Sequence, residues 1–368
     1  TAQVNIGLDF GLLRNRITGT MEVYQAKTDA LLLDQTLLVT SGFDKVRANI
    51  GKTQNRGIEI SISSVNIDRK DFRWVTDVNW SANREKIVEL NSGVTRDITN
   101  GWFVGQPIRV WFGYEYDRLW QDTPEDERLM ELYNKAGTVR EVYRAGQTKV
   151  VDQQLIEDPT KEGQDGWKTV TLASGEKVTY MDNGFGDIST TTNDDRQIRG
   201  TSRPDWVAGL TNTFTYKNFD LSFFIYARVG NMVNGALETY GQRRESSVWS
   251  PDNPDAKFYQ PLSGVTGLTS HNDTRGLTNG TMVTVRNISL SYTLPQQWIK
   301  KLDLNRVQVY GQVLNPFLWG GELVKLGINP DDITNWGTAS SGAGATNIGS
   351  TNHTMLIRSW VIGLRVGF

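Results

Sequence analysis

The feature that most constrains the fold is a period of two in hydrophobicity, which recurs along the whole chain. In FDLSFFIYARV (219–229), every second residue from Phe219 to Ile225 is apolar, and polar residues such as Asp220 and Ser222 lie between them. Successive side chains of a β-strand point to opposite faces, so such a segment has one apolar and one polar face. The same pattern predicts strands over residues 3–10, 14–27, 55–65, 71–84, 205–216, 219–229, 281–293 and 305–315, and in the final SWVIGLRVGF (359–368).

The polar faces and the connections together favour a transmembrane barrel. Charged residues such as Glu59, Asp77 and Arg306 recur on the polar faces, where a water-filled lumen would solvate them and a dry core would not. Short turns are expected near 12–15, 66–71, 217–218 and 295–303, and long polar segments at 28–54, 85–204, 230–280 and 316–353. Short turns at one end and long loops at the other are typical of transmembrane β-barrels. Alternation alone leaves a soluble β-sandwich open as the alternative.

Two arginines break the pattern, because Arg286 and Arg358 share the parity of the apolar face. A charge facing lipid at the bilayer midplane costs about 2–4 kcal/mol, and little near the interface. We therefore expect both arginines near the extracellular rim, or beside a β-bulge that resets the parity.

Counting strand directions divides the chain. If the last strand runs toward the periplasm, residues 71–84 end outside the cell and residues 205–216 begin there. The strand-like segment 102–117 could cross a membrane once, since one crossing takes about 9–11 residues. A single crossing, however, would place the start of residues 205–216 in the periplasm, which contradicts the strand directions. We therefore expect residues 1–84 to be barrel strands, residues 85–204 an extracellular elaboration, and residues 205–368 barrel strands again.

Composition excludes several classes of function. The formal net charge of −2 offers no basic field for nucleic acid. There is no cysteine, and only two histidines are present, so neither a thiol nucleophile nor a Cys-ligated metal site is expected. The acidic cluster Asp187, Asp194 and Asp195 lies in a Gly/Thr-rich stretch and is interpreted as loop surface rather than a glycosidase pair. We expect no enzyme activity and no cofactor.

Several blocks of sequence resemble the SusC-like TonB-dependent outer-membrane transporters, in the order in which that family has them. They are NIGKTQNRGIEIS (49–61), WVTDVNWSANREKIVEL (74–90), VGQPIRVWFGYEYDRLWQ (104–121), RPDWVAGLTNTFTYKNFDLSFFIYARVGN (203–231), WSPDNPDA (249–256), VRNISLSYTLP (285–295), VYGQVLNPF (309–317) and the apolar ending at Phe368. Together they cover most of the chain.

This resemblance implies a fold, a function and partners. The chain would supply about nine strands, the C-terminal portion of a 22-stranded antiparallel barrel with long extracellular loops. The family imports oligosaccharides or peptides, driven by the TonB complex, with a SusD-like lipoprotein on the extracellular face. The plug and about thirteen strands are expected from an N-terminal remainder of the same transporter. Alternatives are a signalling or scaffolding member of the superfamily and a soluble β-rich glycan-binding or hydrolytic domain.

Candidate ligand-binding residues lie in the segments predicted to be extracellular. Tryptophan faces pack well on sugar rings and peptide side chains, which makes these tryptophans candidates; they could equally pack the loops or contact the lipoprotein. The GQRRE run adds two arginines that could meet an anionic ligand or a loop carboxylate. The substrate-binding candidates are Trp102, Trp120, Trp249, Trp336, Arg243 and Arg244. The terminal Phe368 resembles the family's signal for the barrel-assembly machinery, and no metal site is expected.

Overall fold

The computed structural model consists mainly of β-strands, nine of which form one curved antiparallel sheet, here called the wall. The structure describes residues 1–36, 45–90, 93–98, 101–136, 143–151, 155–181, 195–234, 248–256, 274–300, 304–325, 329–331, 333–336, 349–351 and 356–367. In spatial order the wall strands are β1 (Ala2–Leu12), β2 (Ile17–Thr36), β3 (Lys45–Arg69), β4 (Phe72–Glu89), β14 (Trp206–Tyr216), β15 (Phe219–Val229), β18 (Met282–Thr293), β19 (Arg306–Gly320) and β22 (Ser359–Gly367). Each strand predicted from the sequence corresponds to one wall strand.

Of the wall strands, β2 and β3 extend furthest beyond the ranges that the alternation predicts. The expectation that residues 28–54 form a polar connection is wrong at both ends, because β2 continues to Thr36 and β3 begins at Lys45, directly opposite. The register shifts between Thr28 and Leu32, which marks bulges in the ladder. Backbone hydrogen bonding therefore extends the hairpin past its amphipathic part. The bulges shift the register there, so the sequence no longer alternates regularly.

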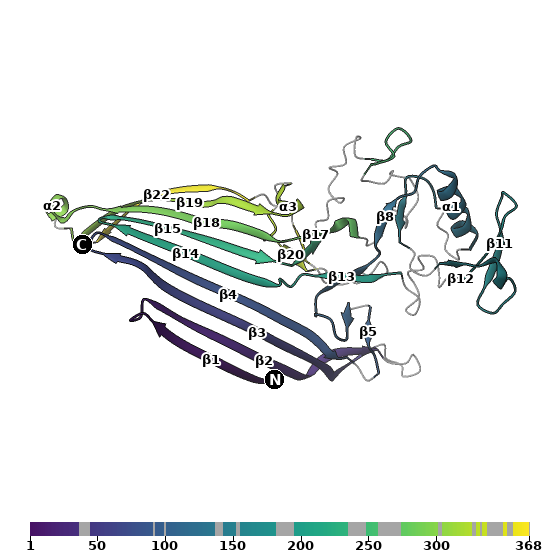
Figure 1. Ribbon diagram of the computed structural model, residues 1–368, viewed down its shortest axis with the longest axis horizontal. Helices are drawn as coiled ribbons and strands as arrows, with labels where there is room; N and C mark the ends of the chain where they lie inside the picture. Colours follow the sequence, from purple (N-terminus) through teal and green to yellow (C-terminus); the bar gives the residue numbers. More distant parts are fainter. Residues whose placement is uncertain are drawn as a thin grey trace.

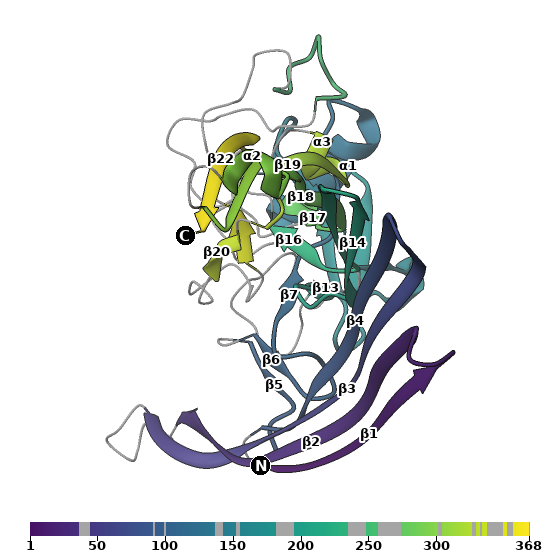
Figure 2. The same ribbon diagram turned by 90° about the vertical axis from the view of Figure 1, so that its left-hand side faces the viewer.

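The wall has one end of short turns and one end of long connections. Figure 1 shows the short turns gathered with the small helix α2 (Gln296–Ile299) and the chain's C-terminus, while the small sheets lie at the opposite end. The β14–β15 turn has only two residues, of which Lys217 takes a left-handed φ of 53°. Figure 2 shows the wall curving from β1 round to β22, as a segment of a barrel does.

Aromatic rings cover glycines on neighbouring wall strands. Tyr24 lies directly opposite Gly57, and a Cβ at Gly57 would come within 2.5 Å of the Tyr24 hydroxyl. Tyr310 and Gly363 form a second such pair, where the added Cβ would be 2.4 Å from the ring. The glycines leave space in which the tyrosine rings lie flat on the sheet, so these cross-strand pairs help to hold the register.

The outer face of the wall is apolar along the middle of the strands, and a polar side chain within this part, Asn212, is hydrogen-bonded. The Trp74 ring stacks on Phe214 with 5.4 Å between ring centroids, and Phe214 lies 6.1 Å from Phe223 on the next strand. Asn212 shares this face. Its side-chain oxygen accepts hydrogen bonds from Trp74 Nε1 at 2.8 Å and from Thr76 Oγ1 at 2.7 Å. These bonds offset the cost of a polar group in an apolar environment.

The inner face gathers charges, and a bulge moves Arg286 onto it. Asn287 and Val285 pair with successive residues of β15, which leaves Arg286 as the extra residue. Its guanidinium forms an ion pair with Asp331, which also lies 3.2 Å from Arg228. The expected parity-resetting bulge is therefore present. The second irregular arginine, Arg358, donates a 2.6 Å hydrogen bond to the Pro316 carbonyl.

The remaining described elements form small sheets and short helices. Between β4 and β14 lie β5 (Arg96–Asp97), β6 (Trp102–Phe103), β7 (Val110–Gly113), β8 (Tyr116–Leu119), α1 (Pro124–Ala136), β9 (Thr148–Val150), β10 (Ile156–Glu157), η2 (Pro159–Lys161), β11 (Lys168–Thr171), β12 (Lys177–Met181) and β13 (Gln197–Thr201), together called the loop module. Later elements are β16 (Met232–Asn234), η4 (Thr274–Gly276), β17 (Leu277–Asn279), α3 (Glu322–Lys325), β20 (Ile333–Trp336) and β21 (Gly349–Thr351).

The segment 102–117, which looks like a strand in the sequence, contributes three short strands to small sheets and none to the wall. Among the described residues, no helix combines the length and the apolar character that a membrane crossing needs. The extracellular position of residues 85–204 stays a prediction.

The two faces of the wall predict opposite tolerance of charge. In the full-length protein, Phe223→Arg should lower the free energy of unfolding by about 2–4 kcal/mol, because the guanidinium would face lipid near the midplane. Ser222→Arg is the matched control, since its side chain faces inward beside Ser289. Folding titrations into lipid vesicles measure both values. Equal tolerance of the two changes would show that the assignment of faces is wrong.

Candidate functional site

The local structure of the candidate site begins with α1, a helix that the strand pattern does not reveal. Thr123 precedes Pro124 at the first helical position. The Thr123 hydroxyl accepts a hydrogen bond from the Asp126 N–H at 3.3 Å, and its carbonyl accepts one from the Glu127 N–H at 2.8 Å. A capping threonine, a proline at the first position and acidic residues in the first turn are the standard start of a helix. The stretch TPEDER (123–128) therefore carried the signal for this helix.

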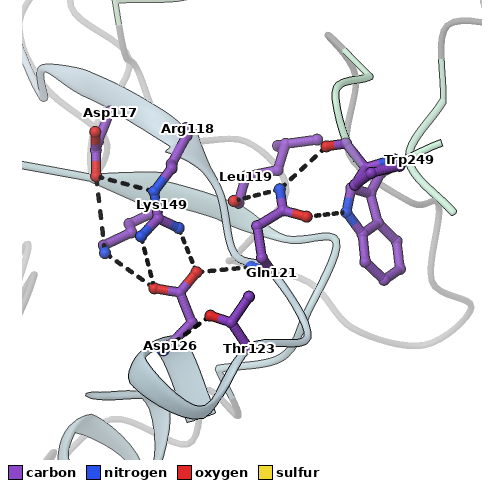
Figure 3. A network of polar contacts seen from close by, with 9 residues as sticks. Asp117, Arg118, Leu119, Gln121, Thr123, Asp126, Lys149 and Trp249 are labelled. Carbon is purple, nitrogen blue, oxygen red and sulfur yellow. Dashed lines mark hydrogen bonds and ion pairs between the residues drawn. The ribbon is translucent and has the colours of Figure 1, made fainter. Parts of the chain in front are cut away.

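One buried carboxylate organises the turn between β8 and α1. The Asp126 side chain has no solvent exposure. It forms an ion pair with Arg118 and accepts hydrogen bonds from the Gln121 N–H at 2.8 Å and from Lys149 Nζ at 3.1 Å (Figure 3). Burial alone would raise the pKa of the Asp126 carboxyl, but these hydrogen bonds outweigh burial and hold the pKa below its ordinary value. Asp126 is thus charged and joins β8, β9 and α1.

The Gln121 side chain connects this turn to a segment far along the chain. Its amide nitrogen donates to the Leu119 carbonyl at 2.9 Å and to the Pro254 carbonyl at 3.1 Å, and its oxygen accepts a 3.1 Å hydrogen bond from Trp249 Nε1 (Figure 3). Trp249 also packs on Leu119. The structure therefore brings together two of the motif blocks, 104–121 and 249–256, which belong to different wall connections.

A cavity of about 610 Å³ lies between these two segments. Residues lining it include Tyr116, Arg118, Asp122, Thr123, Trp249 and Asp255. The Arg275 guanidinium lies 4.9 Å from the centroid of the Tyr116 ring. The cavity thus offers two aromatic side chains, hydroxyl and amide groups, and charges of both signs.

This lining suits the binding of an organic ligand. Aromatic surface with a few polar groups is the usual make-up of a site for an organic ligand. Within the described part of the chain, no group of three or more histidine or acidic side chains is placed to hold a metal ion.

The described tryptophan candidates pack within the protein rather than lining one site. Trp120 is 1% exposed and lies in a core with Leu132 and Tyr180, while Lys149 Nζ is 4.5 Å from the centroid of its ring. Trp249 is 6% exposed and borders the cavity. Trp102 lies at a separate small apolar cavity of about 110 Å³ beside Ile87.

The other candidates are less fully described. Trp336 lies on β20, where only the backbone is described, and Arg243, Arg244 and Phe368 lie outside the described residues. Substrate contact by the six candidates and the assembly role of Phe368 stay predictions. Sequence reasoning missed Tyr116 and Asp255 at the cavity, although both belong to quoted motif blocks.

Comparisons with known proteins agree with the fold. No family model matches the chain. The curated TonB-dependent receptor P3 of Formosa agariphila is 31% identical over 335 residues, which cover 86% of this chain and 29% of the receptor. The TonB-dependent receptor SusC of Bacteroides thetaiotaomicron is 27% identical over 327 residues, or 86% of this chain and 28% of the receptor. The chain thus spans less than a third of the length of these two relatives.

A solved structure of the RagAB peptide transporter matches 100% of this chain and 35% of its own chain, with a TM-score of 0.63 and 19% identity. The fold is therefore that of an outer-membrane β-barrel transporter. The chain belongs to the TonB-dependent receptors, as its SusC-like motifs predict, and its location is the outer membrane. This location excludes the soluble-domain alternative. The relatives named here are receptors and a transporter, and none is named as an enzyme.

The Asp126 network predicts a measurable loss of local stability. In the full-length receptor, Asp126→Asn should lower the stability of the β8–α1 region by about 2 kcal/mol, because charge-assisted hydrogen bonds are lost. The folded-state pKa of Asp126 is lowered, so its contribution is present above its ordinary pKa near 3.8 and is lost as the pH falls through the lowered value.

Hydrogen exchange of the α1 amides at neutral pH measures this loss. Asp122→Asn is the matched control, since Asp122 is exposed at the cavity. Unchanged exchange in Asp126→Asn would contradict the central role of this carboxylate.

Proposed function

We propose that the chain is part of a TonB-dependent transporter that imports oligosaccharides or peptides across the outer membrane together with a SusD-like surface lipoprotein. Kinship with SusC supports the transporter class, and the likeness to a structure titled a peptide transporter supports the fold. The observation that carries the proposal is a ligand-sized cavity at one end of the wall, which the loop module forms together with the 249–256 segment of another wall connection.

The wall needs the rest of the transporter to become a closed barrel. The edge strands β1 and β22 each pair with one neighbour in the described structure, and an unpaired strand edge is not tolerated in lipid. We expect an N-terminal remainder of the same transporter to supply about thirteen strands, for 22 in all, with the plug and the contact with the TonB complex.

The cavity is the proposed point of substrate contact outside the membrane. Tyr116 can pack against a sugar ring or a peptide side chain. Arg118 and Asp255 offer charges of opposite sign, which can pair with a peptide or hydrogen-bond to sugar hydroxyls. The lipoprotein would close over the loop module, which extends beyond the wall in Figure 1.

The orientation of the wall can be tested first. In a full-length receptor with no other accessible cysteine, Thr160→Cys should react with a membrane-impermeant thiol reagent on intact cells lacking the lipoprotein. Thr160 is exposed in the loop module. Lys70→Cys, at the β3–β4 turn, should react only after the outer membrane is opened. The reverse pattern would place the loop module in the periplasm and refute the proposal.

Uptake tests the function itself. Cells carrying Tyr116→Ala with Asp255→Asn should need about tenfold more substrate for half-maximal uptake, because an aromatic contact and a charged contact are lost. Panels of labelled peptides and oligosaccharides, in cells with and without TonB, identify the substrate class. Asp165→Asn, exposed elsewhere in the loop module, is the control. Surface binding without uptake in the wild type would favour a signalling receptor instead.

A further inference from the structure

The outer face of the wall changes from apolar to cationic at one level of β3 and β4. Ile60 pairs with Trp80 and Ile58 with Ala82, and the next pair on the same face is Arg56 with Arg84. The following pair is Gln54 with Lys86, and Lys27 of β2 lies opposite Gln54. The apolar band therefore ends abruptly in a row of cations at the end of the wall that carries the loop module.

Four cations at this level surround a cavity of about 280 Å³ on the outer side of the wall. They are Arg56, Arg84, Lys86 and Arg203, here called the basic rim patch, and the cavity is also lined by Gln54, Glu85, Gly105 and Pro107. Arg203 comes from the segment just before β14, and its guanidinium donates to the Glu85 carbonyl at 3.1 Å. Two wall strands and the loop module thus contribute to one site.

The positive charge of the patch is only partly balanced. Arg84 pairs with Asp205 at 2.8 Å. Among the described residues, Arg56 and Lys86 form no ion pair or side-chain hydrogen bond, and Arg203 Nε is buried without a hydrogen-bond partner. Burial and the nearby Arg84 lower the pKa of Arg203. Arginines placed directly opposite on neighbouring strands repel each other, so an anion between them would relieve a real cost.

We propose that the basic rim patch binds the phosphate of an anionic lipid headgroup in the outer leaflet. Guanidinium groups pair with phosphate through two parallel hydrogen bonds, and basic pockets beside membrane-spanning segments bind anionic headgroups. The acyl chains of such a lipid would lie along the apolar face that continues from Ile58 and Trp80. A lipid is favoured over a soluble anion because the patch opens on the outer side of the wall, continuous with this apolar face.

The lipid proposal depends on the proposed function in one respect only: the end of the wall that carries the loop module must lie at the outer leaflet. Its test uses the full-length receptor purified in detergent. Arg56→Gln with Lys86→Gln should lower the amount of phosphorylated lipid retained per receptor by about tenfold, as measured by native mass spectrometry. Both residues are exposed, so the barrel should still form, which heat-modifiable gel migration verifies.

The matched control is Arg69→Gln with Lys70→Gln, which removes the same charge from the end of β3 and the β3–β4 turn, at the short-turn end of the wall. This control should retain as much lipid as the wild type. Equal retention by the rim-patch variant would overturn the proposal.

A second arm separates the two sources of phosphate. In one set of samples, receptors in nanodiscs of zwitterionic lipid are titrated with inorganic phosphate. In the other set, the receptors are placed in nanodiscs that contain increasing amounts of an anionic lipid. Only the anionic lipid should bind in a manner that depends on Arg56 and Lys86. Equal dependence for inorganic phosphate would make the patch a site for soluble anions and overturn the lipid assignment. Lipid retention needs no transport, so its outcome is independent of the uptake assay.

Discussion

Backbone hydrogen bonding in a medium without water is the constraint on which this structure depends. In the hydrocarbon layer every N–H and C=O must find a partner within the protein, and antiparallel ladders provide these partners without interruption. The wall strands pair residue by residue over most of their length, with bulges where the pairing shifts. Alternation of the side chains follows directly, because each strand separates lipid from lumen and its two faces meet different solvents.

The same constraint explains how the wall handles residues that do not suit their surroundings. Asn212 lies on the apolar face, yet its oxygen is engaged by two neighbours on β4. Arg286 would face lipid by simple counting, and one extra residue in β18 places it beside Asp331 instead. In both cases the backbone ladder is kept or locally shifted, and the side chain is satisfied by a specific partner.

The wall could be predicted from the sequence and the loop module could not. A period of two is a local signal, so strands such as β15 were found at their observed limits. The extension of β2 to Thr36 was missed because pairing continues there across bulges without regular alternation. The candidate site depends on contacts between residues far apart in sequence, such as Gln121 with Pro254, for which no local pattern exists. By contrast, the start of α1 has a local signal in TPEDER, which a search for alternating residues does not detect.

The hydrogen bonds of Gln121 join the turn before α1 to the 248–256 segment, which belongs to another wall connection. A sequence change in one of these segments therefore alters the contacts of the other. A recombinant that takes residues 90–205 from a distant relative keeps its own 248–256 segment. The imported residues would then face a partner segment that they do not match. Chimeric receptors should therefore take both segments from the same parent, because the hydrogen bond between Trp249 and Gln121 holds the two segments together.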